Sequence, residues 1–92
     1  MRESDIEAAL RGGAAMLGGI AYKFVSPGRV GVPDRIVVMP SGVTVFVEMK
    51  APGKKPEPHQ EREHERLRKL GHRVYVIDSL EGVKQLLEEL GA

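Results

Sequence analysis

Cysteine is missing from this chain of 92 residues, and its absence excludes two kinds of stabilisation. Without cysteine there is neither a disulfide framework nor a thiolate-bound zinc ion. The three histidines, His59, His64 and His72, are not spaced to place two imidazoles on one helical face with a third, acidic ligand. We therefore expect no zinc site, and the lack of cysteine favours a reducing, cytoplasmic location.

Long apolar runs are missing as well. No stretch approaches the roughly 20 apolar residues that a membrane-spanning helix needs, so we expect no membrane partner. The charged start, Met1–Asp5, differs from a secretory signal. Residues 1–92 are expected to form a single domain, with a core near the lower limit of self-sufficiency. Because small domains often gain stability by pairing, a homodimer is expected.

A strong overall charge is also lacking, since the formal net charge is only +1. The charge is nevertheless unevenly spread: residues 51–73 carry seven Lys/Arg and four Glu, whereas residues 74–92 carry one Lys and four acids. This distribution suits a protein that turns one face toward an anion. An ordinary solvated helix surface explains the same charges.

Hydrophobic periodicity and turn residues predict three helices and four strands. Ser4 and Glu7 have the spacing of a capping box at the start of the first helix, and Gly18-Gly19 ends that helix. The expected elements are a helix from Ser4 to Leu17, strands over 20–25, 35–39, 43–50 and 73–77, a helix over 59–70, and a last helix that begins at Asp78 or Ser79 and ends at Gly91.

The element order αβββαβα predicts an α/β fold with a mixed sheet flanked by helices. The second and third strands are joined by a short turn at Pro40-Ser41-Gly42 and should form an antiparallel hairpin. The third and fourth strands are joined through a helix, so they should be parallel with a right-handed crossover.

The hairpin register predicts a pair of acids. If Met39 pairs with Val43 across the turn, Ile36 lies opposite Phe46 and Asp34 lies opposite Glu48. Directly opposed residues have Cβ atoms roughly 4.5–5.5 Å apart. Two carboxylates at that separation repel each other unless a cation lies between them, and a hard divalent ion with oxygen ligands suits this position.

Strand alternation adds a lysine to this pair. Lys50 lies on the same face as Glu48, one pleat further along the third strand. A divalent ion polarises a phosphodiester and lowers the pKa of its bound water, and a nearby ammonium steers that water or stabilises the developing negative charge. The alternative is an acid–lysine pair that only supports the structure.

Two further side chains are candidates for the same site. Gln60 lies at the start of the middle helix, on the face that carries His64 and Leu67, so it should point inward and orient Lys50 or a ligand water. Glu7 is placed to reach the metal from the first helix, although the capping box already accounts for it. The alternative for Gln60 is a structural role, in which its side chain only hydrogen-bonds to nearby backbone groups.

Contacts to a nucleic-acid backbone are expected from two basic segments. Ser26 and Arg29 lie in a Gly- and Pro-rich loop upstream of Asp34, where backbone amides and a guanidinium can hold a phosphate. Lys54 and Lys55 lie in the connector before the middle helix and would add salt-dependent affinity. A plain connecting loop is the alternative for the first segment.

These residues together match a known signature. The chain resembles the PD-(D/E)xK nuclease superfamily, and within it the small stand-alone members of the VRR-NUC (virus-type replication–repair nuclease) family. The resemblance covers nearly the whole chain. Its most specific parts are Ser26-Pro27-Gly28-Arg29-Val30-Gly31-Val32-Pro33-Asp34-Arg35, then Phe46-Val47-Glu48-Met49-Lys50-Ala51-Pro52-Gly53, and then Gln60.

The resemblance implies a restriction-endonuclease-like αβββαβ core, here with an extra C-terminal helix, and Mg²⁺- or Mn²⁺-dependent hydrolysis of phosphodiesters. It implies that Asp34, Glu48 and the backbone carbonyl of Met49 bind the metal, and that Lys50 is the catalytic lysine. It also makes Gln60 a site residue and matches Glu7 to the acid of the first helix. Arg35, within the matching stretch, is a further candidate for DNA contact.

The small relatives are thought of as dimers that act on branched DNA, resembling Holliday-junction resolvases. We therefore expect a homodimeric, structure-selective DNA endonuclease that is cytoplasmic and encoded by a bacterium or a phage. Two alternatives remain open. One is a nucleic-acid-binding module of the same fold with little catalysis, and the other is a structural domain in which Asp34 and Glu48 form an edge pair.

Overall fold

A computed structural model describes residues 1–91, and its elements follow the predicted order. The helices are α1 (Glu3–Met16), α2 (Pro58–Lys69) and α3 (Leu80–Gly91), and the strands are β1 (Ile20–Lys23), β2 (Arg35–Val38), β3 (Thr44–Met49) and β4 (Val74–Ile77). A short 3₁₀ turn at Pro40–Gly42 joins β2 to β3. Of the helices within residues 1–91, none is long and apolar enough to cross a membrane.

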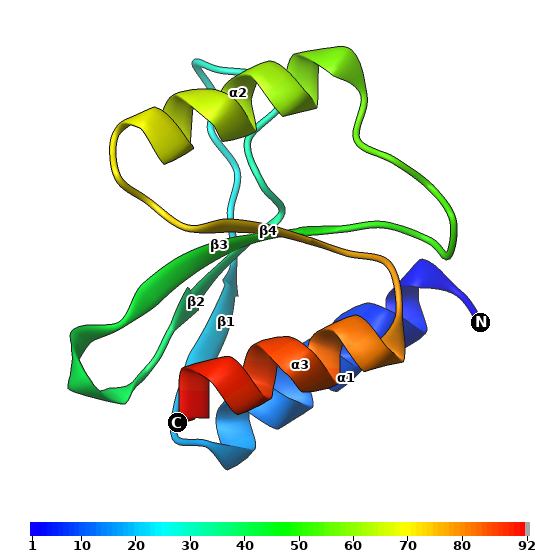
Figure 1. The fold of residues 1–92 in the computed structure, drawn as a ribbon, viewed down its shortest axis with the longest axis vertical. Helices are drawn as coiled ribbons and strands as arrows, with labels where there is room; N and C mark the ends of the chain where they lie inside the picture. Colours follow the sequence, from blue (N-terminus) through cyan, green and yellow to red (C-terminus); the bar gives the residue numbers. More distant parts are fainter. Residues whose placement is uncertain (92) are drawn as a thin grey trace.

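The strands form one sheet in the order β1-β2-β3-β4. β1–β2 and β2–β3 are antiparallel, whereas β3–β4 is parallel. Helices α1 and α3 lie together on one face of this sheet, and α2 lies on the other (Figure 1). The α/β fold with a mixed sheet flanked by helices is therefore confirmed.

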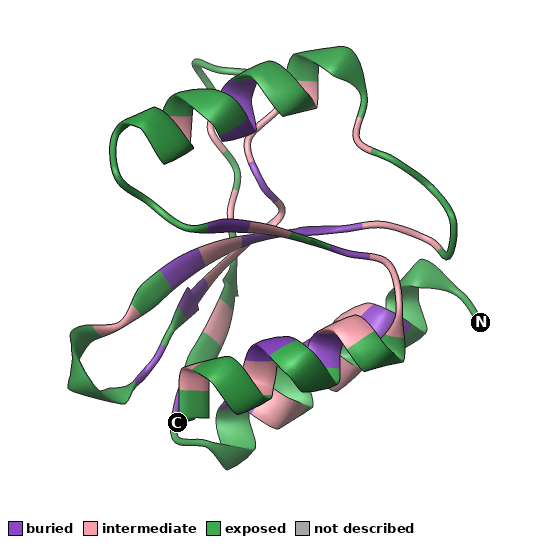
Figure 2. Ribbon diagram, in the orientation of Figure 1, coloured by how far each residue is buried: buried purple, intermediate pink, exposed green. Residues whose placement is uncertain are grey.

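The apolar core fills the space between the sheet and the α1/α3 layer (Figure 2). Alternating residues of β2 and β3 point into it, because side chains two apart share one face of a strand. The helices contribute residues at helical spacing to the same layer. The buried core residues include Ile6, Leu10, Ala14, Val37, Val45, Val47, Met49, Val83 and Leu86.

The opposite face of the sheet is covered by a helix with a polar inner surface. Within α2 the buried residues are Glu63 and His64, while Leu67 is only half-buried. Gln60, His64 and Leu67 do share the inward face, as predicted. Because buried polar groups need partners, this layer is the place in the molecule where polar side chains are held in fixed positions.

The hairpin has the predicted register. Met39 donates its N–H to the carbonyl of Val43 at 2.8 Å, and Ile36 pairs with Phe46. The last pair of the ladder is Arg35 opposite Val47. Asp34, just before Arg35, therefore lies beside Glu48, just after Val47. One residue of slip would have moved Glu48 to the apolar core face.

The predicted capping box of α1 is wrong by two residues. The helix begins at Glu3, with Arg2 as its N-cap, and the Asp5 carboxylate accepts the Arg2 backbone N–H at 2.9 Å. Ser4 is inside the first turn. Since Asp5 performs the capping, the Glu7 carboxylate is available for another partner and forms an ion pair with Arg35 at 2.9 Å.

The loop between β1 and β2 lies close against the start of α2. Gly31 has a φ of +84°, and a Cβ atom at this position would lie 2.7 Å from the backbone carbonyl oxygen of His59. Two reasons therefore disfavour a side chain at this position: the left-handed backbone conformation, and the lack of space for a Cβ atom. This contact holds the loop that leads to Asp34 against the helix that carries Gln60.

Replacing Gly31 with alanine should destabilise the protein more than the same change at Gly53. Gly53 has a similar φ of +79°, but a Cβ atom added there would meet no atom within 4 Å, so Gly53→Ala isolates the backbone cost. A left-handed non-glycine residue costs about 1–3 kcal/mol. Urea denaturation of both variants should show a clearly larger loss for Gly31→Ala; equal losses would mean that the loop yields without strain.

Candidate active site

The C-terminal end of β3 places two of the predicted site residues, Glu48 and Lys50, on the α2 side of the sheet. Glu48 is buried, with a side chain only 2% exposed, and the Lys50 ammonium lies 3.5 Å from its Oε2. The Lys50 backbone N–H donates to the carbonyl of Ile77 at 2.9 Å, which ties this end of β3 to β4. Glu48 therefore projects from β3, and Lys50 projects from the residue just after the strand, which is held by its bond to β4.

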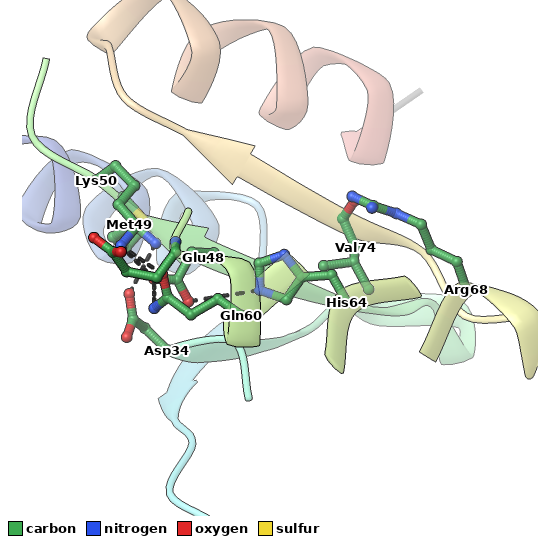
Figure 3. A network of polar contacts seen from close by, with 9 residues as sticks. Asp34, Glu48, Met49, Lys50, Gln60, His64, Arg68 and Val74 are labelled. Atoms are coloured by element: carbon green, nitrogen blue, oxygen red, sulfur yellow. Dashed lines mark hydrogen bonds and ion pairs between the residues drawn. The ribbon is translucent and has the colours of Figure 1, made fainter. Parts of the chain in front are cut away.

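Asp34 is held beside them from both neighbouring strands. Its Oδ2 accepts the backbone N–H of Met49 at 2.9 Å, and its carbonyl accepts the N–H of Phe24 at 2.7 Å. The preceding Pro33 is fully buried and stiffens the approach. The carboxylate is thus fixed against β3 next to Glu48, where the register places it (Figure 3).

Gln60 joins the acid and the lysine through one amide group (Figure 3). Its Nε2 donates to Glu48 Oε2 at 3.0 Å, and its Oε1 accepts from Lys50 Nζ at 2.8 Å. The same Oε1 accepts the backbone N–H of Glu57 at 2.8 Å, which makes Gln60 part of the capping box of α2. The orientation of the amide is therefore fixed by the start of its own helix.

Burial and a like charge raise the pKa of Glu48 to about 7. Burial of the carboxylate is the larger cause and the negative charge of Asp34 is the second. The Lys50 ammonium and the hydrogen bond from Gln60 oppose this shift without cancelling it. Near neutral pH the acid is therefore poised between its protonated and ionised forms.

His64 lies beside Glu48 in the candidate site and was not among the residues predicted from the sequence. Its side chain is 1% exposed, and its Nε2 lies 3.8 Å from Glu48 Oε1. Burial, together with the positive charges of Arg68 and Lys50, lowers the pKa of His64 and keeps the imidazole neutral. The signal that could have found it is its position four residues after Gln60, on the same inward face of α2.

The residues present fit a hard divalent cation. Glu48 Oε1 is buried without a hydrogen-bond partner, and Asp34 adds a second carboxylate beside it. Since the N–H and C=O of one residue in an extended strand point to the same neighbour, the Met49 carbonyl faces the Asp34 side as its N–H does. Across residues 1–91, no three His, Cys, Asp or Glu side chains cluster as a metal site, so water would complete an oxygen-rich shell.

Glu7 and Arg35 lie elsewhere. The Arg35 guanidinium is 12% exposed, pairs with Glu7 and donates to the Ala21 carbonyl at 3.2 Å. In the strand alternation Arg35 shares the core face with Val37, opposite to Glu48. Within the described part of the chain, Glu7 makes no hydrogen bond or ion pair with the Glu48–Lys50–Gln60 network, and Arg35 offers little surface to DNA.

The remaining candidates for DNA contact lie at the surface around α2. Arg29 pairs with Glu63 at 3.5 Å and donates its backbone N–H to the carbonyl of Ser26 at 3.4 Å. Lys54 and Lys55 are exposed on the connector and line a cleft between it, α2 and the end of β4.

Comparisons with known proteins show the family to which the chain belongs. The model of the VRR-NUC domain family matches residues 8–81, a range that contains Asp34, Glu48, Lys50 and Gln60. A relative named "Putative nuclease p44", from Acyrthosiphon pisum secondary endosymbiont phage 1, is 61% identical over 79 residues, which are 86% of this chain and 85% of the relative. A solved structure titled "VRR_NUC domain" superposes with a TM-score of 0.87 at 42% identity and covers 94% of both chains. The chain therefore belongs to the VRR-NUC domain family and is a nuclease.

Proposed function

We propose that this nuclease is a divalent-metal-dependent DNA endonuclease, with its active site formed by Asp34, Glu48, Lys50 and Gln60. The observation that carries the proposal is the single amide of Gln60, which binds Glu48 and Lys50 at once beside the anchored Asp34. Two acids, an ammonium and an amide, brought from three segments of the chain to the C-terminal end of β3, form a constellation suited to hydrolysis of a phosphodiester.

Asp34, Glu48 and the Met49 carbonyl would hold Mg²⁺ or Mn²⁺, since these ions prefer oxygen ligands. When bound, such an ion polarises the scissile phosphate and lowers the pKa of an attached water. The unpartnered Glu48 Oε1 and the anchored Asp34 carboxylate support this assignment.

Lys50 acts as a positioned positive charge. Its ammonium donates to Gln60 and lies near Glu48, so it retains donor capacity for a water or a phosphate oxygen. Gln60 restricts the freedom of this flexible side chain, which reduces the ordering cost in the transition state. His64 lies against Glu48, with its Nε2 3.8 Å from Oε1, and contributes to the burial of the carboxylate.

The substrate that we propose is branched DNA, cut by a homodimer. The support is the resemblance of the chain to small resolvase-like nucleases, together with its limited core. A closed two-fold pair would present two equivalent sites and so allow two symmetric cuts. Mass measurement in solution by light scattering tests the dimer separately from the chemistry.

Cleavage assays test the proposal directly. We expect wild-type protein to cut a labelled four-way junction in Mg²⁺ or Mn²⁺ but not in EDTA, with less cutting of linear duplex and single strand. Lys50→Ala should lower the rate by roughly 100-fold or more, because it removes a preorganised charge from the reacting centre. Lys84→Ala, on the exposed face of α3, is the matched control and should cut at the wild-type rate.

Each result separates one function from another. Metal-dependent cutting that Lys50→Ala abolishes supports the endonuclease, and the ranking of substrates decides the preference for branches. Binding without cutting under every metal would replace the proposal with a nucleic-acid-binding module.

The raised pKa of Glu48 predicts an unusual dependence of stability on pH. In the unfolded chain this carboxyl titrates near 4.5, and in the folded protein it titrates at about 7. Between these values the folded state binds more protons, so its free energy of unfolding falls as pH rises through this window. Each pKa unit corresponds to about 1.4 kcal/mol, so the loss is about 3 kcal/mol.

Glu48→Gln provides the control, because an amide of the same shape does not titrate. In EDTA, thermal denaturation of wild type and Glu48→Gln from pH 4.5 to 8 should show wild type losing stability relative to the variant as pH rises. Saturating Mg²⁺ should offset the wild-type loss near and above pH 7, because the ionised carboxylate is the form that binds metal. Parallel curves for the two proteins in EDTA would contradict the raised pKa.

A further inference from the structure

Three exposed basic residues of α2 lie on one line of the helix surface. Arg62, Arg66 and Lys69 follow at i, i+4 and i+7 and so form one exposed line, with His59 at its start. The exposed acids of the helix, Glu61 and Glu65, lie on the neighbouring flank. We call Arg62, Arg66 and Lys69, together with Arg29 from the facing loop, the basic stripe.

Two surface hollows run along this stripe and share Arg62 and Arg66. The first lies between α2 and the loop and is lined by Gly28, Arg29, Val30, His59, Arg62, Glu63 and Arg66. The second continues toward the C-terminal end of α2 and is lined by Arg62, Glu65, Arg66, Lys69 and Leu70. Four cations here face two carboxylates, Glu63 and Glu65, so the hollows keep a positive charge.

Glu63 orders part of the stripe. Its carboxylate is 8% exposed and lies 3.5 Å from the Arg29 guanidinium and 3.3 Å from Arg66 Nε. A buried carboxylate needs such partners, and both arginine side chains remain more than half exposed. Glu63 therefore fixes two arginines from two different segments without covering them, which leaves their outer N–H groups free to bind an anion.

Arg62 and Lys69 complete the stripe without internal partners. Within residues 1–91 neither side chain makes a hydrogen bond or an ion pair with another protein group, and both are exposed. Exposed cations without protein partners are the form in which Lys and Arg bind phosphate and release counterions. Their removal would break no hydrogen bond or ion pair within residues 1–91.

The cleft that contains Lys54 and Lys55 has a different balance of charge. Its lining holds four cations, Lys54, Lys55, Arg62 and Arg68, against three carboxylates, Glu61, Glu65 and Asp78, so its excess of positive charge is smaller. Arg68 on the same flank donates to the carbonyl of Val74 at 2.8 Å and is engaged in the fold. The basic stripe is therefore the better surface for a polyanion.

The position of the stripe relates it to the active site. It begins beside Gln60, whose amide binds Glu48 and Lys50. From Arg62 to Lys69 an α-helix rises about 10 Å. One strand of a duplex carries a phosphate about every 3.4 Å of helix axis, so the stripe matches the span of roughly four successive phosphates.

We propose that the basic stripe binds the phosphate backbone of the DNA beside the position that is cut. This inference rests on the proposed function and adds a named binding surface to it. Arg29, from the loop that leads to Asp34, and Arg66 form its ordered half, and Arg62 and Lys69 form its open half.

The test compares two double variants that remove the same charge from opposite sides of the sheet. Arg62→Ala/Lys69→Ala changes the stripe, and Arg11→Ala/Lys84→Ala changes exposed residues of α1 and α3, which lie on the other side (Figure 1). Binding to a labelled junction is measured from 50 to 200 mM salt in Mg²⁺, with Lys50→Ala added to each protein to prevent cutting. Cleavage kinetics are measured on the same pairs with native Lys50.

The stripe variant should lower the slope of log affinity against log salt by about two, because each lost phosphate contact removes about one counterion from the exchange. Its KM should rise while kcat at saturating DNA stays within a few-fold of wild type. The control should leave the slope and KM unchanged. Equal salt slopes for the two double variants would overturn the inference, even if wild type cuts DNA.

Failure of the proposed function gives a different pattern. Protein with native Lys50 could bind DNA without cutting it while the stripe variant still loses salt dependence. That result would support the inference about the basic stripe and contradict the proposed endonuclease function. If wild type neither binds nor cuts any nucleic acid, both proposals fall.

Discussion

Burial of the Glu48 carboxylate beneath α2 is the constraint on which the rest of this structure depends. A carboxylate that is 2% exposed must be neutralised or paired, and the chain meets this need only in part. Gln60 and Lys50 contact Oε2, whereas Oε1 faces His64 at 3.8 Å without a hydrogen bond. A pKa of about 7 expresses this incomplete compensation. The remaining electrostatic demand at Oε1 is the physical reason to assign a cation to this position.

The same constraint explains the composition of α2. A helix that covered the sheet with leucines would pack more firmly, but it would leave Glu48 without a donor. The buried positions instead carry Glu63 and His64, and the helix is held by specific contacts, among them the close approach of Gly31 and the Arg29–Glu63 ion pair. Stability and site geometry are therefore coupled in this layer, whereas the apolar layer under α1 and α3 stabilises the sheet independently of the chemistry.

Most of the fold could be predicted from local patterns, because residue types alternate along the strand segments and glycines mark the turns. The register followed from one turn, since each residue along a hairpin fixes the next pair. The start of α1 could not be read in this way. Arg2–Asp5 and Ser4–Glu7 offer overlapping caps; the helix uses the first, and Glu7 pairs with Arg35, a residue distant in sequence. Local propensity carries no information about such a partner.

The part of the candidate site that lies on or next to the strands could be predicted from the sequence, whereas the part on α2 could be predicted only in part. Alternation and register brought Asp34, Glu48 and Lys50 together, but the inward residues of α2 were ambiguous, because a helix rich in Glu, Arg and His is usually a solvated one. The partner surface of the helix resolves that ambiguity. Glu48 and Lys50 lie on the side of the sheet that α2 covers. The helix therefore has to supply polar side chains that hydrogen-bond to them. Gln60, Glu63 and His64 lie at i, i+3 and i+4, and such a polar stripe opposite a charged strand face indicates a site rather than a solvated surface.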